Sequence, residues 1–322
     1  MVDVATIMQQ MMIFVLIMAV AFFLRKIKVF TEETNAQISK IVLKLTLPAF
    51  LISSVLGDRM PIDRAQTPIF FAIIILSFVI TGIICAIFAF TCIKKKDERG
   101  AYVMMGLVGN VNFMGLPFVA AFLGQEVMVF ATMYSLIFTL TTFTIGMKLI
   151  GGKQAKVSAK LIFNPVACAA MIAVLLFLVD FQLPAYGHTF YRVGVVFSRV
   201  FGSLGAVTSP MAMVILGSTL AGMKFKEMFQ GWRTYAISVV RVIVVPIVLF
   251  FALLPLTPAA YPELLKVIII INATAMAISI VIIAANYKAN EKIIGQGIFV
   301  SHLISLITLP IILPWLFSLI PV

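Results

Sequence analysis

The amino-acid sequence predicts an all-α membrane protein of ten transmembrane helices, built as two inverted five-helix repeats. Three observations predict this class. The chain is apolar along its whole length, and loops rich in Lys and Arg alternate with loops that contain few of them. Its two halves also align weakly after a shift of 162 residues. The predicted first repeat covers residues 1–150 and the predicted second repeat covers residues 151–322.

Composition gives the membrane class. Of the 322 residues, 62% are hydrophobic and 11% are charged, and the mean hydropathy is +1.15. A soluble domain carries about 45–50% apolar and about 25% charged residues. Backbone polar groups in lipid must be satisfied within the spanning structure, and the apolar runs are too long for barrel strands. The spans are therefore predicted to be helices.

Charged residues, prolines and glycines divide the chain into ten apolar segments, each long enough to cross a hydrocarbon core of about 30 Å. The predicted spans are residues 5–24, 38–57, 68–93, 101–123, 126–150, 161–181, 195–222, 232–256, 264–286 and 293–319.

The positions of Lys and Arg predict the orientation. Loops after spans 1, 3, 5, 7 and 9 hold 18 of the 24 basic residues. The opposite side holds Arg59, Arg64, Arg192, Arg199 and Lys266. Basic loops stay in the cytoplasm, so we expect a multi-pass plasma-membrane (inner-membrane) protein with both termini outside. Because the net charge of +12 follows this alternation, no nucleic-acid partner is expected.

The internal repeat concerns spans 2 to 4 and spans 7 to 9. It places Thr46-Leu47-Pro48 on Thr208-Ser209-Pro210 and Asn110 on Asn272 without a gap. Because each half has an odd number of spans, the second half enters the membrane from the opposite side. Inverted repeats are typical of secondary transporters, whose sites lie near the midplane where broken helices meet. The alternative is that these few identities coincide by chance.

The segment 109–117, GNVNFMGLP, is the strongest local signal. It places the amides of Asn110 and Asn112, together with Gly109, Gly115 and Pro117, inside an apolar span. Proline removes an amide donor and clashes with the carbonyl four residues earlier. Freed carbonyls at membrane depth are tolerated where protein or a water-filled cavity satisfies them. We expect a break beside a polar site; the alternative is a kinked helix that uses Asn in helix packing.

The same residues resemble a known family. The pattern N-x-x-x-x-G-x-P from Asn110 to Pro117 is similar to the fourth helix of the auxin efflux carrier superfamily, which includes plant PIN carriers and bacterial malate or malonate permeases. Residues 44–51 resemble its second helix, residues 163–165 the entry to its sixth helix, and residues 286–310 its helix 9–10 junction. The resemblance covers essentially the whole chain.

The resemblance implies a scaffold part and a transport part, with helices 4 and 9 broken and crossing at the midplane. It also implies carboxylate substrates such as malate, malonate or auxin-like acids. Family members usually carry a proline in helix 9, but none lies between Pro262 and Pro310 here. A second break would then depend on Asn272, Thr274 and Ser279, or be absent.

Arg241 is the basic residue that lies deepest in a predicted span, and no Asp or Glu occupies the middle of any span. A charge at that depth is a functional candidate, and a substrate carboxylate would be a suitable partner. Two alternatives are a side chain that reaches back to the interface and one that caps helix carbonyls. His302 is the titratable residue left in a span for a proton relay, while sodium could bind at a broken helix.

These observations predict a secondary transporter of small organic anions that works by alternating access and is not an enzyme. The predicted substrate-binding residues are Asn110, Asn112, Gly115, Pro117, Asn272, Thr274, Ser279 and Arg241. The three cysteines form no CxxC motif, so neither a metal nor a cofactor is expected. Expected partners are the anion, the lipid bilayer and a coupling ion, H⁺ or Na⁺, and a homodimer is left open.

Four other readings compete with this one. A sodium-coupled bile-acid-type symporter keeps the same architecture and changes the substrate. A cation/proton antiporter would need buried carboxylates, which the spans lack. An intramembrane enzyme would need a pattern such as HExxH, which is missing. A channel remains open, but inverted repeats with broken helices favour alternating access.

Overall fold

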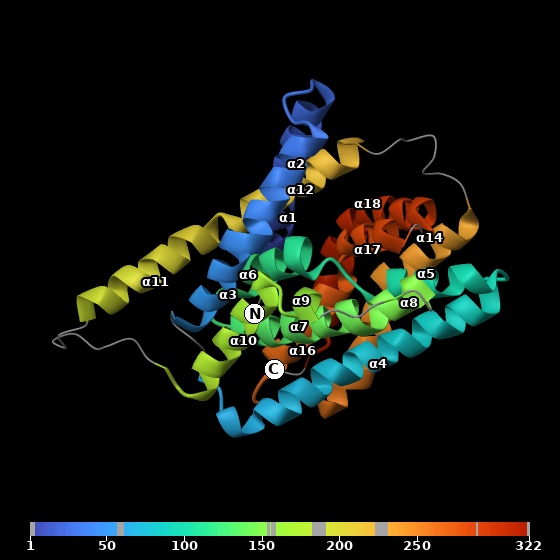
Figure 1. The fold of residues 1–322 in the computed structure, drawn as a ribbon. Coiled ribbons are helices and arrows are strands. Elements are labelled where there is room, and N and C mark those ends of the chain that lie inside the picture. The colour runs from blue at the N-terminus through green and yellow to red at the C-terminus, as the bar shows by residue number, and fades with distance from the viewer. Residues whose placement is uncertain are drawn as a thin grey trace.

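The all-α class is confirmed by a computed structural model, which describes residues 4–56, 61–152, 155, 159–181, 191–222, 231–287 and 289–320 (Figure 1). Within these residues there are helices and connections and no strand. One isolated antiparallel bridge joins Gly109 to Met276, and it marks the place where two interrupted helices meet.

Seven helical stretches of the described chain are long and apolar enough to cross a membrane, by length and composition. They are Ile7–Lys26, Glu32–Leu56, Arg64–Cys92, Met128–Gly151, Val193–Gly222, Trp232–Leu256 and Glu291–Ser318. These correspond to predicted spans 1, 2, 3, 5, 7, 8 and 10, and the shorter apolar helix Pro165–Leu178 lies in span 6. The ten-span inverted repeat is consistent with this arrangement and stays a prediction.

Within the described residues, predicted spans 4 and 9 are each interrupted over several residues, 108–110 and 274–278, as the family resemblance implies. Span 4 consists of α5 (Lys96–Leu107), the π-helical segment η3 (Val111–Gly115) and α6 (Leu116–Leu123). Span 9 consists of α16 (Pro262–Ala273) and α17 (Ser279–Tyr287). Helix 9 is therefore broken although it contains no internal proline.

The remaining helices are continuous or contain a locally altered turn. Their bounds are α1 Val4–Lys26, α2 Glu32–Ile41, η1 Val42–Thr46, α3 Leu47–Leu56, η2 Arg64–Gln66, α4 Thr67–Cys92, α7 Met128–Thr141, η4 Thr142–Gly146, α8 Met147–Gly151, α9 Ala159–Ile162, α10 Pro165–Leu178, α11 Tyr191–Ala206, α12 Thr208–Gly222, α14 Trp232–Val239, η6 Val240–Val244, α15 Val245–Leu253, η7 Leu254–Leu256 and α18 Glu291–Ser318.

Of the four π-helical segments in the described part of the chain, three precede a proline. The segments η1, η3 and η6 end two residues before Pro48, Pro117 and Pro246 respectively. Because proline cannot donate to the carbonyl four residues earlier and its ring clashes there, the preceding turn widens to a π-bulge. Such bulges are frequent at functional sites. Two of them carry the basic residues Lys44 and Arg241.

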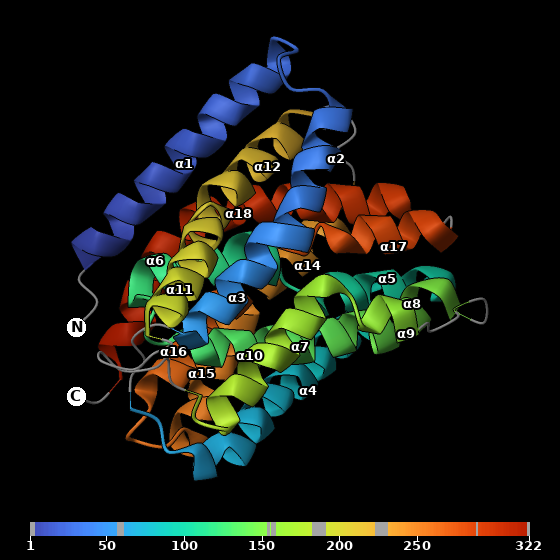
Figure 2. The same ribbon diagram turned by 60° about the vertical axis from the view of Figure 1, so that its left-hand side comes forward.

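The helices pack as two bundles (Figure 2). In the first bundle α1 and α2 pack on α12, and α3 packs on α10 and α11. In the second, α4 packs on α5 and α15, α16 on α6 and α15, and α18 on α14 and α17. The bundles meet where α7 packs on α3 and α10 and where η3 packs on α12. Each bundle contains helices from both predicted repeats.

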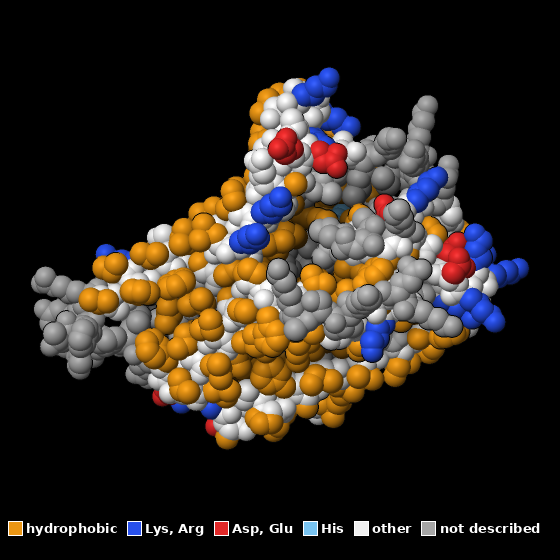
Figure 3. All heavy atoms as spheres, in the orientation of Figure 1, with side chains coloured by type: hydrophobic (Ala, Val, Ile, Leu, Met, Phe, Trp, Pro, Cys, Tyr) orange, Lys and Arg blue, Asp and Glu red, His pale blue; other side chains and the backbone are white. Residues whose placement is uncertain are grey.

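The surface agrees with a lipid environment. Apolar side chains cover most of the face in Figure 3, and Lys and Arg gather toward the ends of the helices. Phe23, Phe90 and Ile307 are 66%, 66% and 67% exposed, which is expected where lipid replaces water as the solvent. Arg59, Lys153, Lys156, Lys224, Lys226 and Lys288 of the predicted topology lie outside the described residues. The orientation of the termini stays a prediction.

Candidate functional site

The two broken helices satisfy each other's backbone at the crossing. The Asn110 N–H donates to the Ala275 carbonyl oxygen at 2.8 Å, and the Ala277 N–H donates to the Val108 carbonyl oxygen at 3.0 Å. Free backbone groups are costly inside a membrane protein, so this short antiparallel pairing makes both interruptions tolerable at once.

Side chains complete the crossing. The Met276 N–H donates to Ser301 Oγ of α18 at 3.1 Å, and the Thr274 hydroxyl donates to the Ile271 carbonyl oxygen at 2.6 Å. Gly109 lies so close to Arg241 that a Cβ atom on it would overlap Arg241 Nη2. Only glycine fits there, because the arginine head group occupies that space.

Arg241 is fully buried and binds the ends of both interrupted helices. Its Nη1 donates to the Gly106 carbonyl oxygen at 3.1 Å and to Asn272 Oδ1 at 3.2 Å, and its Nη2 donates to the Ile271 carbonyl oxygen at 3.3 Å. These carbonyls belong to the last turns of α5 and α16, where a cation is favourable because of the helix dipole. This geometry corresponds to the capping alternative for Arg241.

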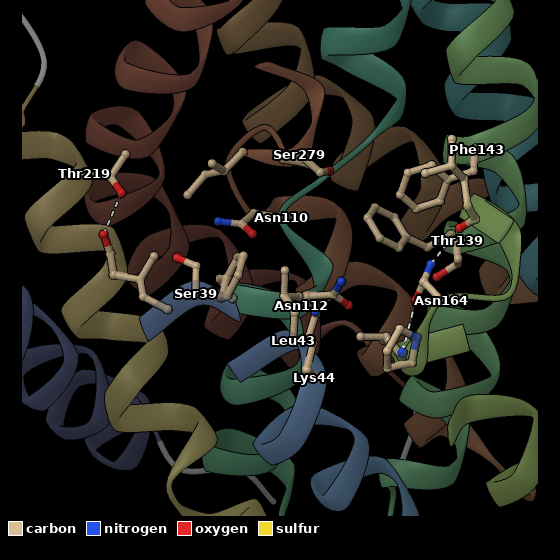
Figure 4. Close-up of a pocket in the computed structure, with 18 of the residues that line it drawn as sticks. Ser39, Leu43, Lys44, Asn110, Asn112, Thr139, Phe143, Asn164, Thr219 and Ser279 are labelled. Carbon is tan, nitrogen blue, oxygen red and sulfur yellow. Dashed lines mark hydrogen bonds between the residues drawn. The ribbon is translucent and has the colours of Figure 1, made fainter. Parts of the chain in front are cut away.

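A cavity of about 330 Å³ lies beside the crossing, between the two bundles (Figure 4). Apolar side chains, among them Phe113, Phe138 and Phe143, make up much of its wall. The polar and charged lining residues are Asn35, Ser39, Lys44, Asn110, Asn112, Thr139, Asn164, Thr219 and Ser279. A mostly apolar cavity with a few convergent polar groups is the usual form of a small-molecule site.

Three of the predicted site residues, Asn110, Asn112 and Ser279, line this cavity. The other five help to form the crossing itself. Gly115 packs on Ile271, Pro117 is buried in the first turn of α6, Thr274 caps α16, and Asn272 and Arg241 bind each other. None of these five is among the residues that line the cavity.

Several polar atoms of the lining are buried and lack a hydrogen-bond partner in the described structure. They are Asn112 Oδ1, Ser279 Oγ and Asn35 Oδ1. Buried polar groups are almost always paired in folded proteins, so unpaired ones that border a cavity are available to a bound molecule.

Lys44 is the one ionisable side chain among the described residues that line the cavity. It is located in η1, where its side chain is exposed and lines the cavity together with Asn112 (Figure 4). By sequence, Lys44 belongs to the 18 basic residues assigned to the cytoplasmic side. Its position four residues before Pro48, inside a predicted span, was the signal that could have identified it. Within the described chain, no three His, Cys, Asp or Glu side chains gather to hold a metal.

The half-helices that begin after each break start at this cavity. Asn112 lies at the start of η3, and Ser279 is the first residue of α17. A helix N-terminus carries a partial positive charge, and the N-termini of broken helices commonly bind anionic groups in transporters. Arg241 neutralises the opposite ends of the paired half-helices, so the positive ends dominate at the cavity.

The chain is similar to known proteins over nearly its whole length. A model of the membrane transport protein family matches residues 6–313. The uncharacterized transporter YfdV of Escherichia coli K12 is 25% identical over 315 residues, which cover 92% of this chain and 93% of the relative. The uncharacterized transporter MJ1031 of Methanocaldococcus jannaschii is 21% identical over 316 residues, covering 94% of this chain and 96% of the relative. The similarity thus includes both broken helices and the cavity.

Proposed function

The chain belongs to the membrane transport protein family, that of the auxin efflux carriers, and on this premise we propose that it carries small organic anions across the membrane by alternating access. The observation that supports an anionic substrate is Lys44, the one charge among the described lining residues, beside the unpaired Asn112 and Ser279. Carboxylates such as malate and malonate have the size and charge that this cavity suits.

Each part of the cavity has a role in this proposal. The Lys44 ammonium supplies a point charge with three donors, while the amide of Asn112 and the hydroxyl of Ser279 supply hydrogen bonds. Phe113 and Phe138 are buried in the cavity wall and lower the local dielectric constant beside Asn112 and Ser279, which strengthens polar contacts there. The cavity volume of about 330 Å³ is near the lower end of small-molecule sites, about 300–1,000 Å³.

The location of the cavity also supports alternating access. One wall comes from α2, η1, α10 and α12 of the first bundle, and the other from η3, α7, η4 and residues 277–279 of the second. Relative movement of two bundles around a fixed site is the general mechanism of transporters with crossing broken helices. We infer that the crossing moves with its own bundle and carries Asn112 and Ser279 past Lys44.

Uptake into proteoliposomes tests the proposal. Purified protein is assayed with radiolabelled malate, malonate, succinate and lactate, with and without sodium and pH gradients; the sodium arm addresses the sodium-coupled alternative. Lys44→Gln should raise KM for dicarboxylates at least about tenfold, or about 1.4 kcal/mol, while Lys44→Arg should stay within about threefold. Lys40→Gln is the matched control, because Lys40 is exposed one turn away and does not line the cavity.

Two outcomes would contradict this proposal. Wild-type protein that takes up none of these acids would exclude the substrate class. Unchanged dicarboxylate KM in Lys44→Gln would exclude Lys44 as a ligand. Asn110→Ala should lower transport at least about tenfold while the detergent-extracted protein stays monodisperse, and normal transport by this variant would assign Asn110 to packing.

The same proposal includes the orientation in the plasma membrane. Both termini should be accessible from outside intact cells, because the basic loops alternate along the sequence. Affinity tags at each end, probed with impermeant antibodies, measure this directly. A tag that is reached only after permeabilisation would exclude the ten-span topology.

A further inference from the structure

His302 of α18 lies behind the cavity wall and is hydrogen-bonded through both ring nitrogens. The side chain is 3% exposed. Its Nδ1 is 2.7 Å from the Ile298 carbonyl oxygen, and its Nε2 is 3.2 Å from Asn110 Nδ2. A carbonyl oxygen can only accept, so Nδ1 carries the proton. The Asn110 amide can only donate through Nδ2, so Nε2 accepts and the ring is neutral.

This arrangement fixes the direction of the Asn110 amide. With Nδ2 bound to His302, the amide oxygen is left on the other side, and Figure 4 shows it on the side of Asn112. An acceptor oxygen at the cavity opposes a carboxylate, which also offers only acceptors. In this state Asn110 is unsuited to the anion that the rest of the cavity favours.

We propose that His302 is a positioning residue whose protonation turns the Asn110 amide and thereby couples anion binding to a proton. A proton from the aqueous phase binds Nε2, and both ring nitrogens then donate. Asn110 Oδ1 must now accept from Nε2, so the amide rotates by about 180° and presents its NH₂ group to the carboxylate. On the other side of the membrane the anion leaves, the proton returns to water and the amide turns back. This inference rests on the proposed function and names its coupling ion.

In the described chain, the charged group that reaches the crossing offers a protonated His302 no negative counter-charge. Arg241 of η6 is the charged group that reaches the crossing, and its guanidinium already binds helix carbonyls. The other charged or titratable side chains on α18 and on the helices packed against it are Arg25, Lys26, Lys96, Asp97, Glu98, Arg99, Tyr102, Arg233, Tyr235, Glu263, Lys266, Tyr287, Glu291 and Lys292.

Most of the charged side chains among these lie in the first or last turns of their helices, and within the described chain none of the acidic ones lies at residues 106–112 or 271–279 of the crossing. A buried imidazolium without a counter-charge is unfavourable. The substrate anion supplies that counter-charge, so proton and anion each stabilise the binding of the other. Reciprocal stabilisation of this kind is thermodynamic coupling between two sites.

The first measurement uses wild-type protein in proteoliposomes that contain a pH-sensitive dye. L-malate uptake should acidify the lumen in step with the radiolabel. The KM for malate should rise about tenfold per pH unit where one proton binds together with the anion. Malate uptake without acidification and with a KM independent of pH would overturn the inference and leave the proposed function in place. Absence of uptake for every acid tested would overturn both.

The second measurement compares two variants on the same substrate, so that the titration of malate itself cancels. His302→Gln cannot be protonated, and its malate KM should vary less than about twofold over the pH range in which the wild type varies at least tenfold. Ser305→Ala is the matched control, because Ser305 is buried one turn away and bonds only the His302 backbone carbonyl. It should keep the wild-type pH profile. A His302→Gln protein with that profile would exclude His302; if this variant does not fold, the wild-type dye measurement decides.

Discussion

The two interruptions at the crossing differ in sequence although they perform the same structural task. The first, at residues 108–110, contains Gly109 and is followed by Gly115 and Pro117, and all three disfavour a regular helix. The second, at residues 274–278, contains only Thr, Ala, Met and Ile. Both leave backbone groups outside the helical pattern. A break in a membrane helix can therefore be encoded by local breakers or by the partners that receive its free backbone groups.

The partners of the second break come from the first break and from two helices, α18 and η6. Its backbone binds Val108 and Asn110 of the first break, Ser301 of α18 and, through the Ile271 carbonyl, Arg241 of η6. If α16 and α17 formed one continuous helix, the Val108 carbonyl and the Asn110 N–H would lose their hydrogen-bond partners. Each buried polar group left unpaired costs about 1–3 kcal/mol. The second break should therefore depend on its partners more than the first does.

Removal of Arg241 tests this dependence most severely. Arg241→Gln deletes the charge and most of the hydrogen bonds to α5 and α16. The loss should be about 2–6 kcal/mol, because the Gly106 and Ile271 carbonyls are left unpaired at about 1–3 kcal/mol each. Arg241→Lys keeps the charge without the planar fork, and its loss of stability should be intermediate.

Cys85 is buried beside Gly106 at the end of α5. In a Cys92→Ala, Cys168→Ala background, its reaction with a thiol dye during heating measures the opening of the crossing.

The result for Arg241 also separates the two roles considered for it. If Arg241 only caps helix ends, both variants should lose thermal stability, and the carboxylate KM of folded Arg241→Lys should stay within about threefold. A large rise in KM at unchanged stability would instead indicate contact with the substrate in another state of the transport cycle.

Gly109→Ala should have the next largest effect. The new Cβ would overlap Arg241 Nη2, and the guanidinium is held in place by four hydrogen bonds. Forcing extra volume into such a site costs about 1–3 kcal/mol. Gly202→Ala is the control, since a Cβ there meets no other atom within 4 Å. Thermal unfolding of both variants checks the prediction, and equal stability would show that Arg241 can move aside.

Much of the fold could be predicted from the sequence, because membrane helices are recognisable as long apolar runs. The helical class and the first break were predictable from apolar runs and from Gly109 and Pro117. The sequence also indicated that Arg241 needed a partner. It gave no means to foresee that the partners are backbone carbonyls, because every residue has one and only the three-dimensional crossing exposes those of Gly106 and Ile271.

The candidate site was less predictable for a related reason. Asn110 and Asn272 are equivalent in the predicted repeat, yet Asn110 lines the cavity while Asn272 binds Arg241 and Tyr134. Lys44 resembles the many lysines that lie at membrane interfaces, and only the position of η1 at the cavity wall distinguishes it. Side-chain direction at a break is set by tertiary contacts, which a repeat in the sequence does not report.

Ser301→Ala isolates the second break. The variant removes the side-chain acceptor of the Met276 N–H, and the free amide should cost about 1–2 kcal/mol. Hydrogen exchange should become faster in residues 274–278 and remain unchanged in residues 108–110. Ser305→Ala, whose hydroxyl bonds only within α18, should change neither segment. Equal acceleration in both segments would mean that the crossing opens as one unit and that the two breaks are not independently held.

Pro117→Ala should have the smallest effect, although Pro117 is the most conspicuous breaker in the sequence. Pro117 lies in the first turn of α6, where a helix has no use for the missing N–H and where the fixed φ of proline is suitable. The alanine N–H could donate to the carbonyl four residues earlier and convert the π-helical turn of η3 to an α-helical one. The pairing of Asn110 with Ala275 and of Ala277 with Val108 would still keep the two helix segments apart. We expect a loss of less than about 1 kcal/mol and malate uptake within about threefold of wild type. Thermal unfolding with the Cys85 reporter measures the first and proteoliposome uptake the second. A loss larger than that of Ser301→Ala would reverse the comparison, because the first break would then depend on its proline and not on the partners it shares with the second.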